Sequence, residues 1–183
     1  AQPVDPDLLA AIGQKLRAIS RSGRFIFRSS TNAEDLAGFN GAGLYESTVV
    51  PADPTADQIA EALRFVWASV WLQRAFEERE WFRIDHRTVA TGVLIQPFID
   101  GAIATGVAVT ENPFKEGRRG ALINSQAVGA TVTGAMGNEL PEQYLVSTWT
   151  GGYYVELISH SSLTDGALIL GESDVHGLTD QLF

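Results

Sequence analysis

The segment FRSSTNAEDLAGFNGAGLYES, residues 27–47, joins a strand-like apolar run to a loop of small and polar residues. The run RFIFRSS predicts a short buried strand that brings Arg28 to its carboxyl end. Three hydroxyl side chains follow, those of Ser29, Ser30 and Thr31. Three glycines come next, Gly38, Gly41 and Gly43.

An arginine at the end of a strand presents a planar, permanently charged fork that can bind a phosphate group bidentately. Glycines let backbone N–H groups approach an anion closely, so the segment predicts a cradle for a polyphosphate. Two simpler interpretations remain open. Arg28 would form a structural ion pair with Glu34 or Asp35, the commoner arrangement for this residue type, and the glycines would only permit a tight turn. Neither G-x-x-x-x-G-K-[ST] nor G-x-G-x-x-G occurs, so a P-loop or dinucleotide-binding fold is not predicted.

The overall composition is that of a folded globular protein. The 183 residues are 45% hydrophobic and 19% charged, which is ordinary for a chain that buries one core. The formal net charge is −9 and there is no basic run, so we expect neither nucleic acid nor an anionic membrane surface as a partner. The sequence contains no cysteine, no apolar run of membrane-spanning length and no signal-peptide pattern. These features predict a cytoplasmic protein.

Helical periodicity dominates the first part of the chain. Residues 7–19 and 57–82 repeat apolar side chains at helical spacing, and Thr55 is a suitable N-cap for the longer helix. GLYESTVV, residues 43–50, predicts a strand between the two helices. From residue 88 onward, short β-branched or aromatic runs alternate with glycine, proline and asparagine, which predicts successive strands.

These patterns together predict an α+β fold with a mostly antiparallel sheet and packed helices. The helices and the phosphate loop occupy about residues 1–87, and a sheet-rich region occupies about residues 88–183. Within the second region, the glycine-rich segment GATVTGAMGNE predicts a loop. DVHGLTDQLF predicts a last helix that begins at Ser173 or Asp174 and ends without a glycine cap or a basic last turn. We therefore expect a piece of a longer protein, although a docked terminal helix would explain the same residues.

Other polar residues carry weaker signals. Gln96 lies inside the apolar run LIQPFI and could hydrogen-bond the edge of a purine, although a sheet-edge glutamine is the commoner case. The three histidines are scattered without metal-ligand spacing, so no metal-binding residue is predicted. The acids within residues 77–80, with Arg74 and Arg79 nearby, predict a solvated helix face with i,i+4 ion pairs.

These residues resemble the nucleotide-binding domain shared by phosphoenolpyruvate synthase, pyruvate phosphate dikinase, rifampin phosphotransferase and the glucan water dikinases. FRSSTNAEDLAGFNGAGLYES is similar to the arginine–serine–serine segment of that family. The similarity continues in the family's order through GVLIQPFI, ATGVAVTENPF and ALINSQAVGATVTGAMGNELPEQYLV. It covers roughly residues 24–147, which is most of the chain.

The resemblance implies an incomplete ATP-grasp domain, in which ATP lies between two α+β lobes and phosphate passes to a histidine on a separate domain. The residues implied in ATP binding are Arg28, Ser29, Gly41, Gly43, Ser47 and Gln96. Arg28 would contact the phosphates and act in catalysis, while Gln96 would face the adenine. Ser47 would line the triphosphate loop with Gly41 or Gly43, since extra residues in GFNGAGLYES leave both glycines as candidates. Mg²⁺ would accompany the ATP.

This sequence also departs from the family pattern. The family uses a lysine near its N-terminus and a late acid…Gln-x-Arg segment to bind phosphate and metal. The late acid…Gln-x-Arg segment is not found here. The expected lysine is not found either, because Lys15 and Lys115 stand in other contexts. The phosphohistidine and pyruvate-binding domains are missing as well, so we expect this chain alone to be inactive.

The resemblance implies the ATP-binding portion of a phosphoenolpyruvate synthase-like dikinase that passes phosphate through a phosphohistidine domain to pyruvate. Two alternatives remain open. One is a noncatalytic nucleotide-binding or partner-docking module, and the other is a related dikinase that acts on a glucan or an antibiotic.

Overall fold

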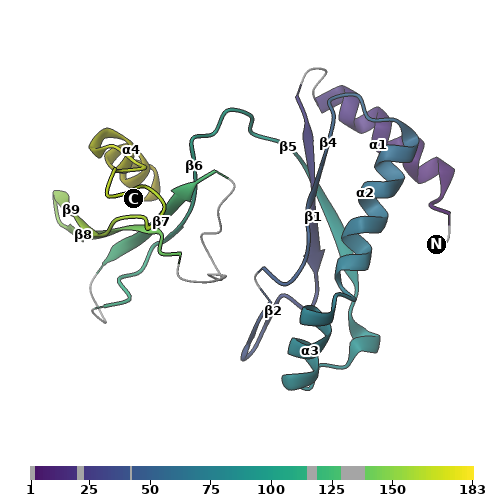
Figure 1. Cartoon of the computed structure of the whole chain (residues 1–183), viewed down its shortest axis with the longest axis horizontal. Helices are drawn as coiled ribbons and strands as arrows, with labels where there is room; N and C mark the ends of the chain where they lie inside the picture. Colours follow the sequence, from purple (N-terminus) through teal and green to yellow (C-terminus); the bar gives the residue numbers. More distant parts are fainter. Residues whose placement is uncertain (1–2, 20–22, 42, 115–118, 129–138) are drawn as a thin grey trace. The chain divides into compact units, whose positions relative to one another are not determined.

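The computed structural model describes residues 3–19, 23–41, 43–114, 119–128 and 139–183. The chain divides into two compact units, Ala1–Asp100 and Gly101–Phe183. Each unit combines helix with antiparallel strands, so the predicted α+β class is confirmed (Figure 1). Within these described ranges, no helix is both long enough and apolar enough to cross a membrane.

The first unit packs helices against one face of a small sheet. Its strands are β1 (Phe25–Thr31), β4 (Thr48–Val50) and β5 (Thr91–Pro97), in the order β4-β1-β5. Its helices are α1 (Pro6–Ile19), α2 (Ala56–Ser69), α3 (Gln73–Trp81) and the short 3₁₀ helix η1 (His86–Thr88). Helix α2 contacts α1 and all three strands (Figure 1). The short strands β2 (Asp35–Leu36) and β3 (Phe39–Asn40) form a separate hairpin.

Strand β1 has one buried and one open face. Phe25 and Phe27 are fully buried, and burial of such a side chain contributes about 1.5–3 kcal/mol. They belong to a cluster with apolar residues of α1 and α2, namely Leu16, Ile59, Leu63 and Val66. Because successive side chains of a strand point to opposite faces, Arg28 lies on the side away from these helices.

The single helix predicted for residues 57–82 is wrong, because the structure divides it into α2 and α3. Thr55 caps α2 as predicted: its Oγ1 accepts the N–H of Gln58 at 3.2 Å, and Gln58 Oε1 accepts the N–H of Thr55 at 2.9 Å. At the other end, the carbonyl of Val70 accepts a hydrogen bond from Nη2 of buried Arg79 at 2.5 Å. This side chain supplies the donor that the next helical turn would otherwise have supplied.

The second unit is a four-stranded antiparallel meander with one helix. Its strands are β6 (Ala104–Val109), β7 (Gly120–Ala127), β8 (Glu142–Trp149) and β9 (Gly152–Ser159), paired in that order. Helix α4 (Glu172–Leu182) follows, with the N–H of Gly171 bound to Asp174 Oδ2 at 2.9 Å. The core contains Ala121, Ile123, Tyr144, Val146, Leu170 and Val175.

A buried carboxylate joins the sheet of the second unit to the segment before α4. Glu142 is fully buried and accepts hydrogen bonds from the N–H groups of Ile169 and Leu170, at 2.8 and 3.0 Å. Ser125 Oγ donates to the same carboxylate at 3.2 Å. The hydroxyl of Tyr144 donates to the carbonyl of Leu170 at 2.9 Å. Strand β8 therefore fixes both the N–H and the C=O of Leu170.

Several segments differ in extent from their sequence-based bounds. Only Thr48–Val50 of the expected strand 43–50 pairs with β1. β5, grouped by sequence with the region that follows residue 88, pairs along the whole of β1 in the first unit. Most of the predicted glycine-rich loop, residues 129–138, lies outside the described residues.

We expect Tyr144 to make the second unit sensitive to alkaline pH. Burial, followed by the nearby Glu142 carboxylate, raises the pKa of Tyr144 from 10.0 to about 12. The folded chain then holds this proton more tightly than the unfolded chain. Its contribution to stability is complete below pH 10 and is lost as the pH rises through about 12.

This expectation can be checked by measuring the free energy of unfolding from neutral to strongly alkaline pH. Wild type should lose stability above pH 10, and so should a Tyr154→Phe control, whose side chain is 60% exposed. Tyr144→Phe should lose less over the same range. An identical alkaline slope in all three proteins would contradict the assignment.

Candidate functional site

Two of the predicted ATP-binding residues share the open face of the first sheet. Arg28 pairs with Leu94 across the β1–β5 ladder, and Ile26 pairs with Gln96. Directly paired residues of antiparallel strands lie on one face, so Arg28 and Gln96 are diagonal neighbours, roughly 7–8 Å apart at Cα. Both are exposed, and Leu94 between them is 50% exposed. The structure thus places a cation and an amide beside each other on an uncovered apolar strand pair.

The Arg28 guanidinium has no hydrogen bond or ion pair with any residue that the structure describes. The alternative ion pair with Glu34 is therefore not formed. The side chain of Asp35, the other candidate partner, lies outside the described part. A cationic fork that is exposed and unpaired remains able to bind an anion.

The hydroxyls after Arg28 divide between the two faces of β1. Ser29 pairs with Val93, a side chain that packs against the helix-covered core. By strand alternation, Ser29 lies on the same side as Phe27, whereas Ser30 lies beside Arg28 and is exposed. A role of the Ser29 side chain in ATP binding stays a prediction, and Ser30 is the serine that shares the face of Arg28.

The two candidate glycines of the loop have different surroundings. Gly41 is buried, and its N–H donates to the carbonyl of Glu34 at 2.7 Å. Gly43 is exposed, has a φ of +78° and leaves open space where a side chain would stand. Gly41 is thus used in packing the loop, whereas Gly43 has the left-handed conformation that glycine adopts most readily. Ser47, the other predicted loop residue, is exposed just before β4.

The loop is held by residues that the sequence analysis did not identify. The hydroxyl of buried Tyr45 donates to the carbonyl of Ala33 at 2.9 Å. The ring of Phe39 meets that of Phe82 edge to face, with centroids 5.2 Å apart. Arg74 Nη2 forms an ion pair with Glu46 at 2.6 Å, across 28 residues of sequence. No local pattern marks these pairs, because their partners come from distant segments.

The predicted solvated face is confirmed for the acids within residues 77–80, which are exposed, but the predicted i,i+4 ion pairs are wrong, because the described residues of α3 form none with one another. Arg74 pairs outside its helix, and Arg79 is fully buried. Arg79 Nε donates to His86 Nδ1 at 3.2 Å, so His86 Nε2 carries the proton that faces Glu80 Oε1 at 2.8 Å. His86 also stacks on Phe76, with centroids 4.1 Å apart. This network, together with the bond to Val70, fixes α3 against α2 and η1.

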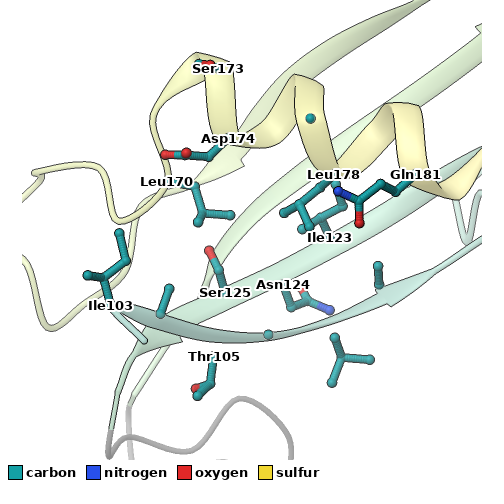
Figure 2. A pocket seen from close by; sticks show the side chains of 15 residues that line it. Ile103, Thr105, Ile123, Asn124, Ser125, Leu170, Ser173, Asp174, Leu178 and Gln181 are labelled. Carbon is teal, nitrogen blue, oxygen red and sulfur yellow. The ribbon is translucent and has the colours of Figure 1, made fainter. Parts of the chain in front are cut away.

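The second unit contains a groove of about 540 Å³ between its first two strands and α4 (Figure 2). Apolar and uncharged polar side chains line it, together with Asp174. Asp174 already accepts the N–H of Gly171, and the described residues that line the groove include no basic one. By itself this groove does not suit a phosphate. Among the described residues, no group of three or more histidines or acids is arranged to hold a metal ion.

We expect Gly41→Ala to disturb the loop. An added Cβ would lie 3.1 Å from both the Ala33 carbonyl oxygen and Glu34 Cα, which are backbone atoms. Overpacking of this kind costs about 1–3 kcal/mol. Hydrogen exchange of residues 43–47 should become faster, and the free energy of unfolding should fall.

Gly13→Ala in α1 is the matched control. Its Cβ would meet only side-chain atoms of Arg17 and Ile59, at 3.5 and 3.6 Å. Alanine in a helix should then be neutral or add about 0.5–1 kcal/mol. Unchanged exchange and stability in Gly41→Ala would show that the loop tolerates the side chain.

The chain is similar to a family of nucleotide-binding domains and to several curated proteins. Residues 1–160 match the family described as the pyruvate phosphate dikinase AMP/ATP-binding domain. A probable phosphoenolpyruvate synthase of Pyrococcus horikoshii is 34% identical over 128 residues, which cover 67% of this chain and 15% of that protein. A phosphoenolpyruvate synthase of Aeropyrum pernix is 28% identical over 151 residues, covering 79% and 18%. A rifampicin phosphotransferase of Streptomyces sviceus is 33% identical over 123 residues, covering 66% and 14%.

The match extends over most of the chain and includes β1, the glycine loop and β5. The chain spans about 15% of the length of the first phosphoenolpyruvate synthase relatives that it matches. On the family match, the chain belongs to the pyruvate phosphate dikinase AMP/ATP-binding domain family.

Proposed function

We propose that the chain binds ATP on the open face of the β4-β1-β5 sheet and that Arg28 holds the phosphates. The observation that carries this proposal is the exposed guanidinium of Arg28, which has no partner among the described residues and lies beside Gln96 and Ser30. In a chain of net negative charge, a cation on an open face offers polyphosphate a local attraction. Membership of an AMP/ATP-binding family supports the same ligand.

The predicted ATP-binding residues other than Ser29 have the following proposed roles in this site. The Arg28 fork would bind phosphate oxygens bidentately and neutralise charge on the group in transfer, the main form of catalysis in phosphoryl transfer. Gly43 would supply a backbone N–H, and Ser47 a hydroxyl, to the triphosphate. Gln96 would hydrogen-bond the adenine edge. Gly41 would act through loop packing, since its N–H is already bound to Glu34.

Mg²⁺ would accompany ATP, because divalent cations neutralise and orient phosphate oxygens. No described residue group forms a metal site of three acids or histidines. Magnesium binds phosphates through few protein ligands and keeps several waters, so Mg-ATP remains compatible with this face. No residue of the chain is assigned as a magnesium ligand.

In the whole protein, we propose a phosphoenolpyruvate synthase-like reaction. ATP would phosphorylate a histidine of another domain, which would pass the phosphoryl group to pyruvate. The support is the set of relatives named phosphoenolpyruvate synthase at 28–34% identity. Relatives named rifampicin phosphotransferase, at 30% and 33% identity, make an antibiotic the second candidate acceptor. A cytoplasmic location stays a prediction.

We expect Arg28→Ala to weaken binding of Mg-ATP by about 10- to 150-fold, since hydrogen bonds to charged groups contribute about 1.5–3 kcal/mol. The Mg-ATP affinity of Arg28→Lys should lie between those of wild type and Arg28→Ala, because lysine keeps the charge without the planar fork. Isothermal titration calorimetry of the 183-residue chain measures both. Arg87→Ala is the matched control, since Arg87 pairs only with the neighbouring Asp85.

Equal affinity in wild type and Arg28→Ala would overturn the assignment of Arg28. No binding by wild type would show that this chain does not form the site alone. The same two variants would then be compared by ATP-dependent phosphorylation in a longer protein that contains the chain.

A further inference from the structure

We infer that Arg74 is a positioning residue that holds the phosphate-binding loop in its binding conformation. The inference rests on the proposed function, because it concerns the loop that carries Gly43 and Ser47. Arg74 belongs to α3, not to the loop, and none of the sequence patterns assigns it a role in the site.

Arg74 contacts the loop through two nitrogens of its guanidinium. Nη2 lies 2.6 Å from Glu46 Oε1, and Nε donates to the carbonyl of Leu44 at 3.2 Å. Leu44 follows Gly43 and Glu46 precedes Ser47, so each contact is made next to one of the exposed residues of the loop. The planar guanidinium offers a separate nitrogen donor to each acceptor, whereas lysine has a single ammonium without a planar fork.

Apolar contacts also join the loop to the helices, since Tyr45 packs with Val70 and Ala75 and Phe39 meets Phe82. Among the described residues, the hydrogen bonds from α3 to the loop come from Arg74. Tyr45 binds the carbonyl of Ala33 and Gly41 binds that of Glu34, which close the loop upon its own first residues. Arg74 instead ties residues 44–46 to a helix that the Arg79 network fixes in place. Among the ion pairs of the described residues, that of Arg74 and Glu46 alone touches residues 32–47.

Arg74 also alters the electrostatics of the loop. Glu46 adjoins Ser47, and its carboxylate would repel a polyphosphate bound there. The guanidinium of Arg74 compensates this charge at 2.6 Å. Loss of Arg74 would therefore free the loop and leave an uncompensated negative charge beside the ligand.

This role differs from a general contribution to stability. The two side chains are 47% and 41% exposed, and exposed ion pairs contribute only about 0–1 kcal/mol to folding. We thus expect Arg74→Gln to unfold at nearly the temperature of Arg87→Gln, a matched variant that breaks an exposed ion pair between Arg87 and Asp85, which includes no residue of 43–47. The effect should be confined to the loop and to its ligand.

The test measures hydrogen exchange of residues 43–47 without ligand and Mg-ATP affinity by calorimetry on the same chains. Arg74→Gln should speed loop exchange and weaken ATP binding by about three- to tenfold, a size typical of coupled neighbours. Glu46→Gln should weaken binding less, since it removes the repulsive charge together with the contact. Arg74→Lys should be intermediate in both measurements.

A charge exchange provides the rescue. Arg74→Glu combined with Glu46→Arg restores an ion pair, so its loop exchange should be slower than in Arg74→Glu alone. Arg87→Gln should match wild type in both measurements.

The outcomes separate this inference from the proposed function. Wild-type loop exchange in Arg74→Gln would overturn the inference, whether or not ATP binds. Faster loop exchange with unchanged ATP affinity would overturn its link to nucleotide binding. A third outcome is that the wild-type chain binds no nucleotide while the loop of Arg74→Gln still exchanges faster. That result would count against the proposed function and would support the role of Arg74 in holding the loop.

Discussion

The candidate site depends on the burial of Phe25 and Phe27 on one side of β1. Their removal from water fixes the register of that strand against α1 and α2, because a slip by one residue would expose both rings. The two-residue period of the strand then obliges Arg28 to lie on the open side. Pairing with β5 brings Gln96 to the same side. An apolar packing constraint therefore sets the position of a polar site.

Helix α3 connects the packed part of the first unit to the loop proposed to bind phosphate. Buried Arg79 joins α3 to Val70 and His86, and Arg74 at the other end of the same helix reaches Glu46 and Leu44. Breaking of buried interactions costs far more than breaking of exposed ones. The buried arginine thus anchors the helix, and the exposed one transmits that fixed position to a loop of small residues.

In the second unit, a buried carboxylate instead of a buried arginine holds one segment of the fold against another. Its sheet is held to the segment before α4 by the Glu142 carboxylate, which satisfies two backbone N–H groups and one hydroxyl. Among its described lining residues, the groove beside α4 has no basic side chain. The cationic residue proposed to bind phosphate therefore comes from the first unit. The relatives named phosphoenolpyruvate synthase are longer proteins, of which the matched part makes up 15% and 18%.

The sequence by itself determined the α+β class, the cap of α2, the strand that carries Arg28 and the family, because these depend on local periodicity and on contiguous motifs. It missed the division between α2 and α3, because the donor to the carbonyl of Val70 is the side chain of Arg79, nine residues further along the chain. It also missed the support of the loop, which joins Arg74 to Glu46 across 28 residues. Only tertiary structure decided that Gly41 packs while Gly43 is open. Such choices follow from which backbone groups and side chains meet in space, and no local pattern contains that information.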